Sequence, residues 1–229
     1  MKERIKESVL SLGADICGVA GISGFCEAPE GFRPADIFPG CESVIVFGVA
    51  LPKGLAEVEP RIIYGHYCRI SCTQADLTAF KTAKEIERAY GGRAVPLPSE
   101  GPYEYWDCEK LEGRGLISMK HAAVLAGLGT LGKSTLLLNE RYGNMLTLGA
   151  VLTDLKLDPD PPAESICVEG CGLCIENCPV HALDGISADQ AKCRRNTYGK
   201  NARGFDTVNC NRCRTVCPVM YGVKRLDQI

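Results

Sequence analysis

The sequence lacks the long apolar segments that membrane insertion or export would require. No apolar run reaches the roughly 18 residues that a transmembrane helix needs. The opening residues, MKERIKESVL, contain neither the apolar core nor the twin arginines of an export signal. An excess of one charge is also missing, because 26 Lys and Arg stand against 28 Asp and Glu, and the chain as a whole is therefore not a polyanion binder. These absences predict a cytoplasmic protein without membrane contact.

What the sequence has in abundance is cysteine, with 14 in 229 residues. In a reducing cytosol this number indicates metal or redox chemistry and not disulfide bonds. Eight of the fourteen lie between Cys167 and Cys217. The other six form no CxxC pair and are expected to be small buried hydrophobic residues. These six are Cys17, Cys26, Cys41, Cys68, Cys72 and Cys108.

A proline- and aspartate-rich segment, LDPDPP at 157–162, separates the two halves of the chain. It cannot continue a helix or a central strand. The cysteine density changes at the same place, and so does the charge, since residues 192–225 contain nine Lys or Arg and a single acid, Asp206. We therefore predict two domains, residues 1–158 and 159–229. The basic residues are expected to offset the charge of bound clusters, although a docking face for an acidic electron donor or for RNA is an alternative.

The first domain has the pattern of a mixed α/β fold. Apolar residues recur with helical period in residues 2–12, 74–90 and 116–126. Strands are predicted at 14–20, 43–50, 93–97 and 145–153, and residues 99–115 are predicted to be a loop. The buried side of the helix at 74–90 is expected to contain Leu77, Phe80, Ala83, Ile86 and Tyr90.

Two cysteine runs carry the strongest functional signal. The first is C-x3-C-x2-C-x3-C-P from Cys167 to Pro179, and the second is C-x2-C-x3-C-P from Cys210 to Pro218. Bacterial two-cluster ferredoxins use C-x2-C-x2-C-x3-C-P, whose fourth cysteine ligates the other cluster. Here the first gap is longer, and the second run lacks its opening cysteine, which Cys193 can supply.

Counting then gives eight thiolates for two [4Fe–4S] clusters. The first cluster is assigned Cys167, Cys171, Cys174 and Cys217. The second cluster is assigned Cys178, Cys193, Cys210 and Cys213. Two all-cysteine zinc sites are the alternative, but both x3-Cys-Pro endings favour iron–sulfur clusters.

A glycine-rich segment, GLGTLGKS at 127–134, fits both the P-loop pattern and G-x-G-x-x-G. A P-loop follows a strand and opens a helix, whereas this segment follows a stretch of helical period, so a nucleotide site is disfavoured. Either a large planar or anionic cofactor rests on the loop, or the loop is only a tight connection. The candidate cofactor-binding residues are Gly127, Gly129, Gly132, Lys133 and Ser134.

Residues 120–154, followed by the two cysteine runs, resemble the epoxyqueuosine reductase family, which carries AGLG-x-x-GK-x-TLL and then LG-x-x-LTD. Residues 14–20 and 38–50 are similar to its N-terminal strands, and the likeness extends over about residues 5–221. The resemblance implies an α+β protein: a nitroreductase-like α/β domain followed by a two-[4Fe–4S] ferredoxin-like domain. It further implies a base-off cobalamin between them, reduced through both clusters by an external electron donor, as in corrinoid-dependent reductive dehalogenases. FMN is the alternative cofactor.

The chain departs from the family at two points. The family's catalytic Asp lies in D-x-x-P-x-x-E-K, and that position falls on Gly113. Asp107, Glu109 and Glu112 are nearby, but spacing favours none, so no catalytic residue is assigned. The chain also ends at Ile229 without the helical repeats that would help to grip tRNA. The resemblance therefore implies a shortened relative, of a kind associated with anaerobes, and makes tRNA an unlikely partner.

The predicted function is an iron–sulfur oxidoreductase whose two clusters feed a cobalamin that reduces a small or nucleoside-like substrate. The alternative is a non-catalytic, ferredoxin-type protein that delivers electrons to a partner's corrinoid or flavin. His66 and His121 are candidate proton donors, although a purely structural role suits each as well. Tyr103, Tyr105 and Trp106 could form the wall of a pocket, an interface or part of the core.

Overall fold

The computed structural model describes residues 1–59, 62–101 and 103–223, so Lys224 and Arg225 of the basic segment lie outside the described residues. The first part of the chain is built on a four-stranded sheet in which every neighbouring pair is antiparallel. Its strands, in spatial order, are β1 (Ile16–Gly21), β2 (Ser43–Ala50), β8 (Leu146–Thr153) and β3 (Ala94–Leu97). The four predicted strands are confirmed, with ends that shift by at most two residues.

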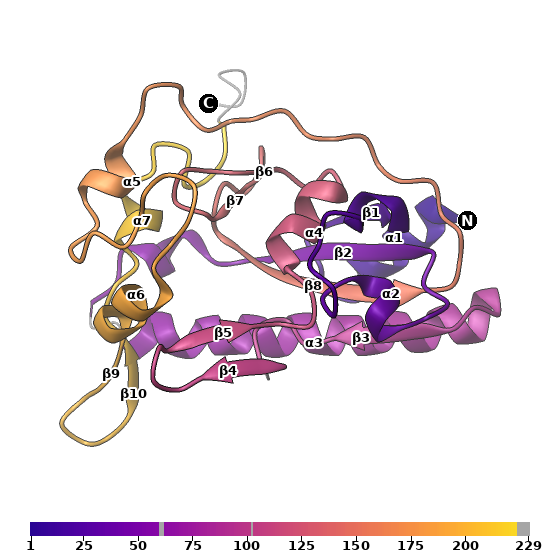
Figure 1. Ribbon diagram of the computed structural model, residues 1–229, viewed down its shortest axis with the longest axis horizontal. Helices are drawn as coiled ribbons and strands as arrows, with labels where there is room; N and C mark the ends of the chain where they lie inside the picture. The colour runs from indigo at the N-terminus through magenta and orange to yellow at the C-terminus, as the bar shows by residue number, and fades with distance from the viewer. Residues whose placement is uncertain (60–61, 102, 224–229) are drawn as a thin grey trace.

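Helices cover both faces of this sheet (Figure 1). They are α1 (Lys2–Ser11), α3 (Ile62–Tyr90) and α4 (Met119–Leu125). Val44 and Val46 of β2 share a core with α4, while Ile45 and Phe47 share a core with α1 and α3. Because successive side chains of a strand point to opposite faces, one apolar run in β2 serves both cores.

The long helix α3 differs from the prediction in its extent and in its buried side. It begins at Ile62, not near residue 74, and the predicted core residues Leu77 and Phe80 are 47% and 55% exposed. Small residues face the sheet instead, among them Ala75 and Ala79, which are fully buried. Small side chains let the helix lie close against the strands, so close packing fixes its rotation and the larger side chains remain outside. Ala83 and Ile86 are buried as predicted.

Shorter elements connect these parts. They are α2 (Pro34–Ile37), β4 (Tyr105–Asp107), β5 (Glu112–Arg114), β6 (Thr130–Leu131) and β7 (Leu137–Leu138). Single 3-10 turns occupy Ile22–Phe25 and Lys53–Ala56. β4 and β5 form a hairpin inside the segment that was predicted to be only a loop. The helix predicted at 116–126 is confirmed in its central part.

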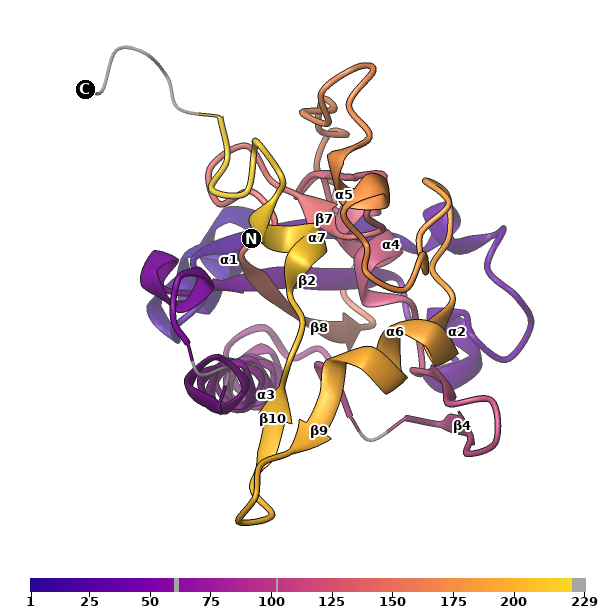
Figure 2. The ribbon, with the colours of Figure 1, turned by 90° about the vertical axis from the view of Figure 1, so that its left-hand side faces the viewer.

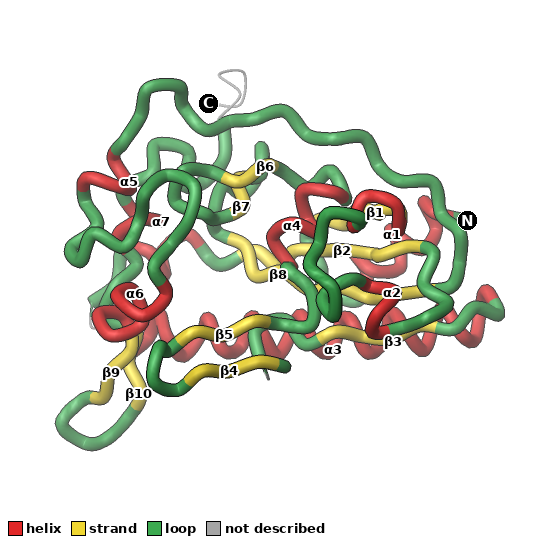
Figure 3. Tube along the Cα trace, viewed as in Figure 1, coloured by secondary structure: helices red, strands yellow, loops and turns green. Residues whose placement is uncertain are grey.

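The second part of the chain contains little regular structure (Figure 3). Its elements are α5 (Leu173–Glu176), α6 (Gln190–Thr197), β9 (Tyr198–Lys200), β10 (Asp206–Val208) and α7 (Arg212–Thr215). The three helices gather at one end of the molecule, and the β9–β10 hairpin projects from it (Figure 2). Within the described ranges, no helix combines the length and the apolar character needed to cross a membrane.

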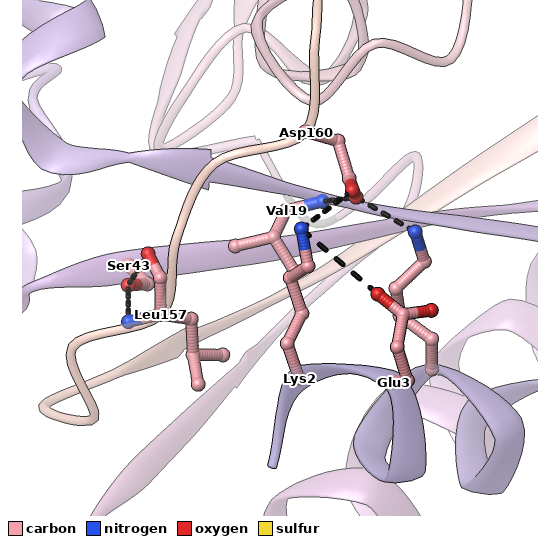
Figure 4. Close-up of polar contacts among 7 residues, drawn as sticks. Lys2, Glu3, Val19, Ser43, Leu157 and Asp160 are labelled. Atoms are coloured by element: carbon pink, nitrogen blue, oxygen red, sulfur yellow. Dashed lines mark hydrogen bonds and ion pairs between the residues drawn. The ribbon is translucent and has the colours of Figure 1, made fainter.

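The segment predicted as a linker is bound to the edge of the sheet. Leu157 donates its backbone N–H to the Ser43 hydroxyl at 2.9 Å, and the Asp160 N–H donates to the Val19 carbonyl at the same distance. The Asp160 carboxylate accepts hydrogen bonds from the Val19 N–H and from the ammonium groups of Lys2 and Lys6, each at 2.9 Å (Figure 4). The domain boundary at residue 158 stays a prediction, but the chain on both sides of it is held against β1 and β2.

The Asp160 contacts predict a pH-dependent contribution to stability. Burial alone would raise the pKa of this carboxyl, but the hydrogen bonds from Lys6, Lys2 and Val19 outweigh it and lower the pKa below 3.8. Because the folded-state pKa is depressed, the stabilisation is complete above the unfolded value and is lost as the pH falls through the folded value. We expect Asp160→Asn to cost about 2 kcal/mol at pH 7.

Thermal unfolding of both proteins between pH 8 and pH 3 checks this expectation. The difference in midpoint should stay constant down to about pH 5 and close only below the ordinary carboxyl pKa. Glu3→Gln is the control, because Glu3 is exposed and lies 3.9 Å from Lys2. A midpoint difference that closes already between pH 8 and pH 6 would contradict the account.

Candidate functional site

The first predicted set of cysteines converges on one hollow in the second part of the chain. Cys167 and Cys171 precede α5, Cys174 lies within it, and Cys217 follows α7. All four line the same hollow. Burial raises the pKa of the Cys217 thiol, and the three other thiols add to the rise by charge repulsion. Cysteines more than forty residues apart in the sequence are thus brought together.

The second predicted set also comes together. Burial raises the pKa of the Cys213 thiol to about 11, and the charge of Arg214 opposes that rise. Cys193, Cys210 and Cys178 lie close enough to raise this pKa further. The Cys178 sulfur accepts a hydrogen bond from the Ala182 N–H at 3.2 Å, a contact that suits a thiolate.

The thiols that act on Cys213 are Cys193, Cys210 and Cys178, and those that act on Cys217 are Cys167, Cys174 and Cys171. In the described part of the chain, no three His, Cys, Asp or Glu side chains form a group that could hold a metal ion. The assignment of the eight cysteines to two clusters stays a prediction.

The six remaining cysteines do not all follow the prediction of burial. Cys41 is buried, and Cys17, Cys68 and Cys72 are half-buried, but Cys26 and Cys108 are exposed. The prediction is wrong for the last two because both lie in surface loops. Burial raises the pKa of Cys17 to about 12, so this thiol stays protonated and unreactive at neutral pH.

The glycine-rich segment joins α4 to β6, the reverse of the order in a P-loop. Gly127 and Gly129 have positive φ, and a Cβ at these positions would fall on the carbonyl oxygens of Pro161 and Leu138. These two glycines therefore serve close backbone packing.

The end of the same segment reaches the first cysteine set. Gly132, Lys133 and Ser134 line the hollow together with the four thiols. The Lys133 ammonium donates to the Cys171 carbonyl at 2.8 Å. The loop thus connects the first part of the chain to the first cysteine set, and its role in binding an organic cofactor stays a prediction.

A buried polar region lies between α3, α4 and α7, and no motif of the sequence predicts it. Burial lowers the pKa of Lys120 on α4, and repulsion from Arg214 on α7 lowers it further. Its ammonium donates to the Thr135 carbonyl at 2.7 Å. Burial raises the pKa of Tyr64 on α3 to about 12, against the opposing charge of Arg214.

Several buried polar atoms around Arg214 have no hydrogen-bond partner among the described residues. They are Nη1 of Arg214, Oδ1 of Asn144, and both side-chain polar atoms of Asn211. Buried polar atoms are nearly always hydrogen-bonded. This region is therefore suited to a ligand that brings its own donors and acceptors, such as a molecule bearing several amide groups.

The candidate acids near residue 113 lie on the β4–β5 hairpin and its turn. The Asp107 carboxylate accepts hydrogen bonds from the Glu109 and Lys110 N–H groups, which lowers its pKa and closes the β4–β5 turn. Glu109 is exposed, and Glu112 is half-buried on β5. A Cβ at Gly113 would lie 3.1 Å from the rings of Tyr103 and Trp106. The position where the resemblance would place an acid is thus flanked by aromatic rings.

The candidate histidines are also held by local contacts. His66 makes an edge-to-face contact with Tyr67, with ring centroids 5.2 Å apart. His121 Nδ1 lies 2.6 Å from the Ser118 hydroxyl at the start of α4. Neither contact excludes proton donation, so both remain candidates.

Comparison with known proteins gives one consistent result. No protein-family model matches the chain. Among curated proteins, the epoxyqueuosine reductase of Bacillus cereus is 26% identical over 262 residues, which cover 96% of this chain and 66% of the relative. The chain therefore spans slightly less than two thirds of the length of this relative.

Two solved structures share the fold. An epoxyqueuosine reductase with an epoxyqueuosine-modified tRNA stem loop matches with a TM-score of 0.68 at 18% identity, over 97% of this chain and 66% of that one. A reductive dehalogenase, described with a mechanism for B12-dependent dehalogenation, matches with a TM-score of 0.65 at 20% identity, over 98% of this chain and 32% of that one. The mixed α/β structure is thus that of these reductases.

These matches confirm the resemblance to epoxyqueuosine reductases that the sequence indicates. They also correct one expectation. The solved relative carries a tRNA stem loop, which runs against the prediction that tRNA is an unlikely partner. That prediction is not retained.

Proposed function

We propose that the chain is a reductase that takes electrons from an external donor through two [4Fe–4S] clusters to a cobalamin bound between its two parts. When bound, the cobalamin supplies a strongly reducing centre, and the proposed substrate is a small or nucleoside-like molecule. The observation that carries the proposal is the separation of eight cysteines into two sets of four, each drawn from both runs of the sequence. A two-cluster ferredoxin has the same ligand pattern, in which one cysteine of each run ligates the cluster of the other run.

The charges around the cysteine sets suit bound clusters. Each cluster with its four thiolates would carry net negative charge, and the half-buried cations Arg214 and Lys120 lie close to Cys213. Lys133 stands beside the first set through its bond to the Cys171 carbonyl. Nearby cations and hydrogen bonds stabilise the reduced cluster and so raise its potential.

The buried polar region between α3, α4 and α7 supports a cobalamin there. The corrin ring carries many amide side chains, and the unpaired groups of Asn211, Asn144 and Arg214 would meet amide oxygens and nitrogens. In this arrangement the chain's own residues orient the ring and exclude water. The charge of Arg214 acts on Cys213, so the second cluster would lie nearer to the bound cobalamin than the first.

One observation favours the alternative of a non-catalytic electron-transfer protein. The position of the family's acid is Gly113, and the nearby Asp107 carboxylate accepts the Glu109 N–H instead of facing the buried polar region. A reductase built on this chain must therefore obtain its proton from another donor, for which His66 and His121 are the candidates.

Binding of cobalamin and of FMN to the anaerobically reconstituted protein tests the proposal. We expect cobalamin to stay with the protein through gel filtration at about one per chain, and FMN to be removed. Retention of neither cofactor by protein that holds both clusters would favour the electron-transfer alternative. Retention of FMN alone would favour a flavin reductase.

A further inference from the structure

The helix α6 carries Cys193, the one proposed cluster ligand that lies outside both cysteine runs. None of its eight residues is buried, and Cys193 itself is exposed. Its Asp189 cap accepts a hydrogen bond from the Lys192 N–H, which closes the first turn. Backbone hydrogen bonds tie the two ends of the helix, from the Asp189 N–H to the Ala182 carbonyl at 2.8 Å and from the Asn209 N–H to the Thr197 carbonyl at 2.6 Å. Between these ends, the orientation of the exposed helix depends on side chains that reach from α6 to another element.

Gln190 provides the first such connection. Its side-chain oxygen accepts the Gly113 N–H at 3.0 Å, and its side-chain nitrogen donates to the Gly113 carbonyl at 3.3 Å. The amide thus pairs with both backbone groups of one residue on β5, much as a neighbouring strand would. This contact joins residues 77 positions apart in the sequence.

Arg194, one turn further along α6, provides the second connection. Its guanidinium lies 5.2 Å from the ring centroid of Tyr103, 5.0 Å from that of Trp106 and 6.0 Å from that of Tyr198. It also donates to the Tyr103 hydroxyl at 3.0 Å. Tyr103 and Trp106 are stacked on each other, with centroids 5.8 Å apart, so the cation meets a rigid aromatic surface.

Gly113 is what allows these two connections to coexist. A Cβ at this position would press on the rings of both Tyr103 and Trp106 at 3.1 Å. The absence of a side chain lets the aromatic pair lie over β5 while Gln190 pairs with its backbone. In this chain the β4–β5 hairpin is therefore shaped as a bracket for α6.

We propose that Gln190 and Arg194 are positioning residues that hold Cys193 where the second cluster requires its fourth thiolate. The inference rests on the proposed function, because it presumes two clusters. In this proposal the β4–β5 hairpin of the first part of the chain helps to assemble the second cluster, whose ligands all lie in the second part. Arg194 acts through the placement of α6 and touches neither a reacting atom nor a substrate.

The test compares Arg194→Ala with Arg195→Ala after anaerobic reconstitution. Arg195 is the matched control because it follows on the same helix, carries the same charge and is exposed, with no side-chain hydrogen bond or ion pair to the described residues. We expect Arg194→Ala to fall from about eight to about four irons per chain and to lose the paramagnetic signal of one reduced cluster, the same result that we expect for Cys193→Ser. Arg195→Ala should keep about eight irons.

Two further variants keep the inference testable if Arg194→Ala fails to fold. Tyr103→Phe removes one hydroxyl from the bracket and should keep both clusters, but it should release one of them to a chelator several-fold faster than Arg195→Ala. Arg194→Lys should give an intermediate rate, because it keeps the charge and loses the planar stacking.

Equal iron content, spectra and release rates in the Arg194, Tyr103 and Arg195 variants would overturn the inference while leaving the proposed function intact. A wild-type protein that assembles no clusters would overturn both. Loss of both clusters in Arg194→Ala at an unchanged thermal midpoint would also contradict the inference, since it assigns Arg194 to one cluster.

Discussion

Replacing Cys217 with serine is expected to remove one of the two clusters and leave the other. Cys217 is the only member of the first set that comes from the second cysteine run, and it closes the hollow that the other three thiols line. A serine hydroxyl is a poor ligand in place of a thiolate. We expect iron to fall from about eight to about four per chain, with an equal loss of acid-labile sulfide.

Cys26→Ser is the control for this substitution. Cys26 is an exposed thiol of the first part of the chain and belongs to neither set. It should retain about eight irons and the spectra of the wild type. A Cys217→Ser protein that keeps all of its iron would refute the ligand assignment, and one that loses all of it would show that the two sets are not separate centres.

Replacing Gly127 with alanine is expected to cause a large loss of stability. Gly127 has a φ of +71°, a conformation that costs an L-residue about 1–2 kcal/mol. The new Cβ would also fall on the Pro161 carbonyl oxygen, so α4 and the segment after β8 would have to separate. Together these effects should exceed about 3 kcal/mol, which lowers the thermal midpoint by roughly 6–12 °C in a chain of this size.

Gly31→Ala separates the two causes. Gly31 has a φ of +83°, yet nothing lies within 4 Å of a Cβ built there. This substitution should therefore show the conformational cost alone, a decrease in midpoint of roughly 2–8 °C. Thermal unfolding followed by circular dichroism under anaerobic conditions measures both variants. Equal decreases would mean that the backbone approach at Gly127 is not tight.

The features that the sequence predicts well depend on local pattern. The continuous apolar run of β2 marks a strand buried on both faces, and it is buried on both faces. The cysteine spacing predicts that Cys217 meets the first three cysteines of the other run, because x3-Cys-Pro directs a ligand away from its own run, and these four thiols line one hollow. Their role as cluster ligands stays a prediction.

The features that it misses depend on packing between distant segments. The rotation of α3 is set by Ala75 and Ala79 against the sheet, which outweighs the pattern of larger apolar residues such as Phe80. The β4–β5 hairpin has short, polar strands without an alternating pattern. Its contacts with Gln190 and Arg194 join segments that no local signal connects, although the density of Tyr and Trp near residue 105 marks the place.

The buried polar region could not be predicted for a similar reason. Arg214 and Asn211 occur in the sequence as members of a basic, cysteine-rich segment, where a surface position is the ordinary expectation. Only the approach of α7 to α3 and α4 buries their polar atoms. Their unmet hydrogen-bonding capacity is the observation on which the proposed cofactor site rests.

Electron paramagnetic resonance of cob(II)alamin added to the anaerobically reconstituted protein tests the central claim most directly. A cobalamin held in the region around Arg214, without its lower base on cobalt, should give the spectrum of base-off, five-coordinate Co(II) at about one cobalt per chain. The spectrum of free cobalamin, in the presence of intact clusters, would contradict the claim that this chain binds a corrinoid.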